Sequence, residues 1–183
     1  MLKKLSVFVC LLCACASSAP QQSPTAAPAT AAPALQPAPE ATPSIGLLNE
    51  RAPLPGVLTG GAPSAEQLAR ASAAGYKTVI SLLSGDEVGD EANEVRAAGL
   101  RFWSIPIAGP SDLTEANALR LSAAMNEPGA QPLIVHCASG NRVGALLALK
   151  AYYVDHASKA EALELGHRAG LKGLQPAVEA QLH

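Results

Sequence analysis

The sequence predicts a three-layer α/β domain in which helices cover both faces of a largely parallel central sheet. Short runs of Val, Ile and Leu alternate with alanine-rich helical patterns, an order that gives parallel strands joined by helices. Glycine or Pro-Gly follows several of the helical patterns, where a helix is expected to end. The stretch from Ile45 to His183 has 139 residues (183 − 45 + 1), which is enough for one compact domain.

The first part of this domain contains three predicted strands and two predicted helices. Val, Leu and Thr over 57–59 predict a short strand that ends at a pair of glycines. Ser64 and Gln67 have the spacing of a capping box, so a helix is expected to begin there and to run to about residue 74. The same kinds of pattern predict a strand over 77–83, a helix over 91–98 and a strand over 100–107.

The second part alternates in the same way. A Gly/Pro/Ser/Asp loop over 108–113 precedes a helix predicted over 114–127. An apolar strand over 133–136 leads through a short loop into a long helix over 143–154. The predicted buried face of this helix consists of Leu146, Leu147, Leu149, Tyr153 and Val154. The remaining predicted helices are 158–169, which opens with a Ser-x-x-Glu capping box, and 175–182.

Residues 1–15 are predicted to be a bacterial signal peptide. Two lysines precede an apolar stretch over 5–14, which is far short of the roughly 20 residues that span a bilayer as a helix. The sequence Leu-Cys-Ala-Cys at its end resembles a lipobox and predicts lipidation at Cys15; the alternative is ordinary cleavage after Ala16. We therefore expect an exported protein of the bacterial cell envelope, periplasmic and attached to the membrane by a lipid anchor.

Composition separates a tether from the domain. Residues 16–44 are mainly Pro, Ala, Ser, Thr and Gln, which cannot bury a core and predict a disordered tether. Residues 45–183 are then the candidate catalytic domain. The net charge of −2 and the pI of about 6.1 exclude a nucleic-acid-binding surface. The histidines lack metal-ligand spacing, so we expect no metal site. We also expect no cofactor, and a monomeric protein.

Cys137 is the candidate nucleophile. It lies in the loop between the strand 133–136 and the following helix, where the helix N-terminus favours a thiolate. The chain has 4 cysteines, and the other three lie at positions 10, 13 and 15. Cys137 is therefore the one free thiol expected in the exported protein. The alternative is a buried and inert cysteine.

The residues around Cys137 favour an oxyanion site. Arg142 offers a planar pair of donors that matches an oxyanion, and Gly140 permits a positive φ. The backbone N–H groups of the loop are expected to point inward at the anion. The predicted anion-binding loop consists of Ala138, Ser139, Gly140 and Asn141. His136 should point away from Cys137 and support the loop through a hydrogen bond.

The stretch from Val57 to about Leu171 resembles the phosphatase-like domain of beta-lactamase-hydrolase-like proteins, in the tyrosine and dual-specificity phosphatase-like superfamily. The matching segments are Thr59-Gly60-Gly61-Ala62-Pro63-Ser64, Gly75-Tyr76-Lys77-Thr78-Val79-Ile80, Ala98-Gly99-Leu100, Ile105-Pro106-Ile107, His136-Cys137-x-Ser139-Gly140-x-Arg142 and Ala169-Gly170-Leu171. This resemblance implies a protein-tyrosine-phosphatase-like fold, with Cys137 as the nucleophile and Arg142 as the phosphate-binding residue.

The sequence departs from the usual phosphatase pattern at two places. Four residues separate Cys137 from Arg142, whereas the usual phosphatase loop has five; four is the spacing of many rhodanese-like sulfurtransferases. Val143 stands where phosphatases commonly carry a Ser or Thr that helps the cysteine leave from the phospho-enzyme. These two departures from the family pattern imply slower or different turnover than in the usual phosphatases.

Asp112 is the candidate general acid, because it lies in a flexible loop after a neighbouring strand. The competing interpretation is a capping box of Asp112 with Glu115 at the start of the next helix. Asp86 and Glu87 are weaker candidates and are expected to be solvated.

Three functions remain open at this point. The first is a phosphatase that hydrolyses phosphate monoesters through a thiophosphoryl-cysteine intermediate. The second is a rhodanese-like sulfurtransferase with a Cys137 persulfide, and the third is a non-catalytic anion-binding module. Each of them takes a phosphorylated or otherwise oxyanionic partner.

Overall fold

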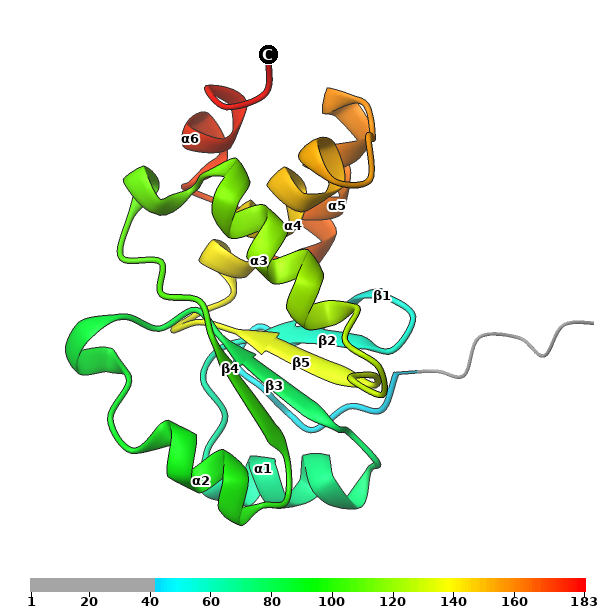
Figure 1. Ribbon diagram of the computed structural model, residues 1–183, viewed down its shortest axis with the longest axis vertical. Coiled ribbons are helices and arrows are strands. Elements are labelled where there is room, and N and C mark those ends of the chain that lie inside the picture. Colours follow the sequence, from blue (N-terminus) through cyan, green and yellow to red (C-terminus); the bar gives the residue numbers. More distant parts are fainter. Residues whose placement is uncertain (1–41) are drawn as a thin grey trace, which may run out of the picture. The chain divides into compact units, whose positions relative to one another are not determined.

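The computed structural model describes residues 42–183 (Figure 1). The predicted signal peptide, the predicted lipidation at Cys15 and residues 16–41 of the predicted tether lie outside the described residues. The strands are β1 (Arg51–Leu54), β2 (Val57–Gly60), β3 (Thr78–Ser81), β4 (Arg101–Ser104) and β5 (Leu133–His136). The helices are α1 (Ala65–Ala73), α2 (Glu91–Ala97), α3 (Glu115–Met125), α4 (Asn141–Tyr153), α5 (Lys159–Ala169) and α6 (Gln175–Glu179), with short 3-10 turns η1 (Gly85–Glu87) and η2 (Pro110–Asp112).

The strands form one sheet in the order β1-β2-β5-β3-β4. β5 lies at the centre and pairs in parallel with β2 and β3, and β4 continues the parallel part. Only β1 is antiparallel, as the edge partner of β2. β1 is absent from the predicted elements because its sequence, Arg-Ala-Pro-Leu, has no β-branched residue and contains a proline, which strands tolerate at an edge.

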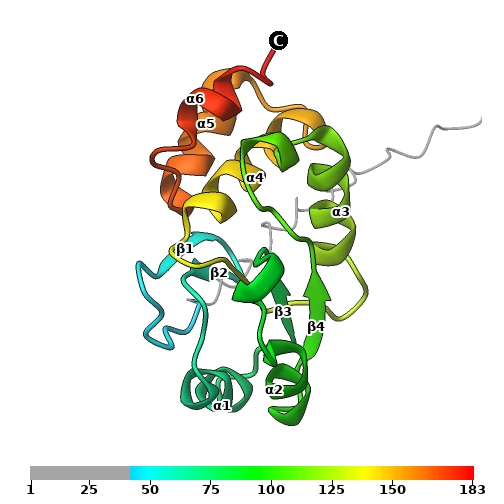
Figure 2. The same ribbon diagram turned by 90° about the vertical axis from the view of Figure 1, so that its left-hand side faces the viewer.

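Helices cover both faces of the sheet, as the sequence predicts. α1 and α2 lie against one face, and α3 to α6 lie against the other (Figures 1 and 2). Because β2, β5, β3 and β4 run parallel, their carboxyl ends lie along the same edge of the sheet, and the loops that follow them meet there. That edge carries the loops after β3, β4 and β5.

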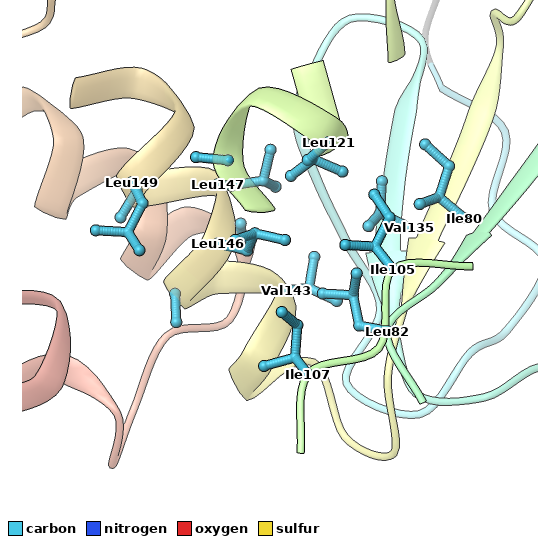
Figure 3. Packing of buried hydrophobic residues seen from close by; sticks show 14 of the residues in the cluster. Ile80, Leu82, Ile105, Ile107, Leu121, Val135, Val143, Leu146, Leu147 and Leu149 are labelled. Carbon is cyan, nitrogen blue, oxygen red and sulfur yellow. The ribbon is translucent and has the colours of Figure 1, made fainter. Parts of the chain in front are cut away.

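Side chains of the strands alternate between the two faces. The core on the α3–α4 face includes Val57, Ile80, Leu121, Leu133, Val135, Cys137 and Leu146 (Figure 3). The core on the α1–α2 face includes Leu58, Leu68, Val79, Val95 and Ile134. Each fully buried aliphatic side chain stabilises the fold by roughly 1.5–3 kcal/mol. The end of β5 continues the alternation, so that His136 lies on the α1–α2 side and Cys137 belongs to the opposite core.

α4 is buried on all sides, so the predicted burial of Leu146, Leu147 and Leu149 is confirmed and that of Tyr153 and Val154 is wrong. Every residue from Val143 to Ala151 is buried, including Lys150, whereas Tyr153 and Val154 are only half-buried. A helix without a polar face is expected in a protein interior. Here α4 lies between the sheet, α3 and α5 (Figure 1), so its N-terminus is fixed by contacts on every side.

Candidate active site

The Cys137 loop joins the end of β5 to the N-terminus of α4. Cys137 is 1% exposed, and its Sγ accepts a hydrogen bond of 3.1 Å from the backbone N–H of Gly140. Gly140 is the N-cap of α4 and has a φ of 92°, a left-handed conformation that favours glycine. The loop thus turns a backbone donor inward onto the sulfur at the positive end of a helix.

Arg142 is held in place by the two neighbouring loops. Its Nη1 and Nη2 donate to the carboxylate of Glu87 at 2.8 and 2.9 Å, and Nη1 also donates to the carbonyl oxygen of Ile107 at 2.8 Å. A guanidinium has five N–H groups, so these contacts leave a second pair, on Nε and Nη2. That remaining pair can bind two oxygens of one anion.

The electrostatics join Arg142, Glu87 and Cys137 in one site. The hydrogen bonds to Glu87 raise the pKa of Arg142, burial opposes this, and the nearby Cys137 raises the pKa further. The same hydrogen bonds from Arg142 lower the pKa of Glu87. Glu87 therefore stays ionised near neutral pH and is a poor proton donor.

Glu87 is exposed, as the sequence predicts, and it also forms an ion pair with Arg142. Its side chain is 43% exposed, yet the turn η1 after β3 brings it onto Arg142. Sequence spacing indicates nothing about this pair, because the two residues lie 55 positions apart in the chain. The only signal was that both lie in loops at the carboxyl ends of neighbouring strands.

Asp112 lies in η2, in the loop that also reaches Arg142 through Ile107. Its Oδ2 accepts the backbone N–H of Ala108 at 2.8 Å, which closes the loop on itself. The predicted capping box with Glu115 is wrong, because Thr114 is the N-cap of α3 and accepts from the N–H at N3. Asp112 is thus not the cap of α3, although its backbone carbonyl oxygen accepts Nδ2 of Asn117 at 2.8 Å.

His136 contacts Glu91 on the other face of the sheet. Its Nε2 lies 2.6 Å from Oε1 of Glu91 without the alignment of a hydrogen bond, and its Nδ1 has no hydrogen-bond partner among the described residues. Oε2 of Glu91 accepts the hydroxyl of Ser81 at 2.6 Å. His136 therefore ties β5 to the start of α2 and does not touch the side chains of the anion loop. An acid in the first turn of a helix looks solvated in sequence, so Glu91 was not a candidate.

The four residues of the predicted anion loop contribute backbone more than side chains. Asn141 Oδ1 accepts the backbone N–H of Lys172 at 2.8 Å, which binds α4 to the turn after α5. The carbonyl oxygen of Ser139 accepts from Asn49 at 3.0 Å. Ala138 and Ser139 are exposed and Gly140 is buried. The inward donor of the loop is thus the N–H of Gly140.

Within residues 42–183, no three His, Cys, Asp or Glu side chains are grouped as metal ligands. None of the helices in that same range is both long enough and apolar enough to cross a bilayer.

No protein-family model and no curated protein matches the chain. Solved structures do. A candidate phosphatase of the DUF442 type from Shewanella putrefaciens CN-32 is 23% identical with a TM-score of 0.59, and the match covers 74% of this chain and 87% of that chain. The catalytic core of the PP-IP phosphatase SIW14 from S. cerevisiae, solved with citrate, is 17% identical with a TM-score of 0.54, over 74% and 86% of the chains.

TpbA of P. aeruginosa, solved in complex with pTyr, is 22% identical with a TM-score of 0.50, over 70% of this chain and 78% of that chain. These likenesses show that the described domain has the tyrosine and dual-specificity phosphatase-like fold that the sequence predicts.

Proposed function

We propose that this protein is a cysteine-dependent phosphatase that hydrolyses phosphate monoesters. The observation that carries the proposal is the Gly140 N–H that donates to Cys137 Sγ at the N-terminus of a buried helix, whose first turn also carries Arg142. A thiolate and fixed donors in one loop suit nucleophilic attack on phosphorus with stabilisation of the phosphoryl oxygens. The fold, which known phosphatases share, supports the same reading.

In the first step the Cys137 thiolate attacks phosphorus, the S–P bond forms and the bond from phosphorus to the leaving oxygen breaks. Arg142 and the Gly140 N–H bind the phosphoryl oxygens while charge develops on them. Asp112 gives its proton to the leaving oxygen. Glu87 keeps Arg142 in place and takes no part in proton transfer, because its lowered pKa leaves it without a proton.

In the second step a water attacks phosphorus, the S–P bond breaks, and phosphate leaves with the thiolate restored. Asp112 accepts the proton of the attacking water. Position 143 offers no hydroxyl to assist the departing sulfur, because it is a valine, whose apolar side chain packs in the core (Figure 3). The second step is therefore expected to be the slower one, and the thiophosphoryl-enzyme should accumulate.

Pre-steady-state kinetics with an aryl phosphate test this prediction on the unmodified protein. We expect a burst of one leaving group per protein, followed by slow turnover, and a mass increase of one phosphoryl group on Cys137 after acid quench. The variant Cys137→Ser should show neither the burst nor turnover. Release of the aryl group at equal rates by both proteins would refute the proposal. A sulfur adduct on Cys137 after thiosulfate treatment, with no phosphoryl adduct, would establish the sulfurtransferase instead.

The substrate is proposed to be a phosphorylated molecule. Of the three proteins compared above, TpbA was solved with pTyr bound, and SIW14 is a PP-IP phosphatase. Both compounds present phosphate oxygens, and this shared group is what the Arg142 fork and the Gly140 N–H can bind.

We also propose that the protein is exported and carries a lipid on Cys15, which the lipobox-like sequence at its N-terminus supports. Expression in a bacterial host with a labelled fatty acid should give a labelled, membrane-bound protein. The Cys15→Ser variant should lose the label and the membrane association. A wild-type protein without label in the soluble periplasmic fraction would favour cleavage after Ala16.

A further inference from the structure

A segment before the first strand lies against the Cys137 loop. The carbonyl oxygen of Leu48 accepts the N–H of Gly61 at 2.8 Å, and the side-chain Nδ2 of Asn49 donates to the carbonyl oxygen of Ser139 at 3.0 Å. A Cβ at Gly61 would lie 2.9 Å from both the Ala138 oxygen and the Leu48 side chain. The segment is therefore in close contact with the loop.

The segment is itself held in one shape. One carboxylate oxygen of Glu50 accepts the backbone N–H groups of Ile45, Gly46 and Leu47 at 3.1, 2.7 and 2.9 Å. Burial raises the pKa of Glu50, but a hydrogen bond from the Ser44 side chain and these backbone hydrogen bonds together outweigh it and lower the pKa overall. The carboxylate thus stays charged near neutral pH, so the segment presents Asn49 from a fixed position.

The carbonyl that Asn49 holds belongs to the peptide between Ser139 and Gly140. A trans peptide is planar, and its C=O and N–H point in opposite directions. The C=O of this peptide points to Asn49, and its N–H donates to Cys137 Sγ. A peptide next to a glycine in the left-handed region turns over readily. If it did so, the carbonyl oxygen would face the anion and repel it.

We propose that Asn49 is a positioning residue for the anion loop: its amide fixes the Ser139–Gly140 peptide with the N–H toward Cys137 and the bound oxyanion. The residue type suits both requirements of the position. Asn49 has a φ of 52°, which Asn tolerates better than most residues, and its amide supplies the donor. This role rests on the proposed function for its consequence, but the peptide orientation itself can be measured without turnover.

The test uses Asn49→Gly, which accepts the positive φ without strain and removes the side-chain amide. The first measurement is hydrogen exchange and the ¹H–¹⁵N signal of the Gly140 amide in the free protein. We expect exchange at Gly140 to become about tenfold faster, which corresponds to the loss of one hydrogen bond, together with a shifted signal. Signals of the sheet should stay unchanged. Asn49→Asp, which offers only an acceptor, should give the same or a larger effect.

The second measurement is the affinity for inorganic phosphate by titration calorimetry, where we expect a loss of about tenfold. Asn93→Ala is the matched control, because it removes another side-chain amide contact, to Asp90, away from the loop. An Asn49→Gly protein whose Gly140 amide has wild-type exchange and signal would overturn the inference. A wild-type protein that binds phosphate without turning over an ester would overturn the phosphatase and leave the role of Asn49 standing.

Discussion

The substitution Arg142→Lys is expected to lower kcat/KM for an aryl phosphate on the order of 10³-fold. Arginine makes three contacts here with two loops and still has a pair of N–H groups for the anion. A lysine ammonium is one compact charge. It cannot bond Glu87, the Ile107 carbonyl and two phosphoryl oxygens together. The loss should appear mainly in kcat, because the donors matter most when charge develops on the phosphoryl oxygens.

Steady-state kinetics on wild type and Arg142→Lys measure this effect. Arg168→Lys is the matched control, since Arg168 forms an exposed ion pair with Glu164 on α5, and such pairs contribute little. The control should retain wild-type kcat/KM. Equal kcat/KM in Arg142→Lys and wild type would remove Arg142 from the anion site.

The substitution Gly144→Ala is expected to destabilise the domain by about 3 kcal/mol or more. A Cβ at Gly144 would lie 2.1 Å from the backbone N of Leu171, 2.6 Å from the carbonyl oxygen of Gly166 and 2.7 Å from the Cα of Leu171. All three atoms are backbone, so no side chain can turn away. α4 and α5 would have to separate at their closest approach, which would disturb the helix that carries the Cys137 loop.

Urea denaturation followed by circular dichroism gives the free energy of unfolding. Gly173→Ala is the matched control, because a Cβ there meets no atom within 4 Å and the residue is exposed. Its unfolding free energy should stay within about 0.5 kcal/mol of wild type. A Gly144→Ala protein as stable as the control would mean that the two helices are free to move apart.

The layers of the fold follow from local patterns in the sequence. Strand β5 has the predicted bounds, and the capping boxes at Ser64 and Ser158 begin helices where expected. These features are local. A capping box needs only two residues three positions apart, and a short apolar run predicts a buried strand. The order Cys137-x₄-Arg142 also identified the candidate loop, because both residues lie on one short turn at a helix N-terminus.

The residues that support that loop could be identified only from the tertiary structure. Glu87 binds Arg142 across 55 positions, and Asn49 binds Ser139 across 90. Several acids in the strand-end loops had the same local pattern, and spacing along the chain could not rank them. The partners of Glu87 and Asn49 follow from the strand order. β3 and β4 lie on one side of β5, and β2 lies on the other side, where the residue after β2 contacts the segment before β1. A hydrogen bond requires about 3 Å between atoms, and only the assembled sheet sets distances on that scale between residues so far apart in sequence.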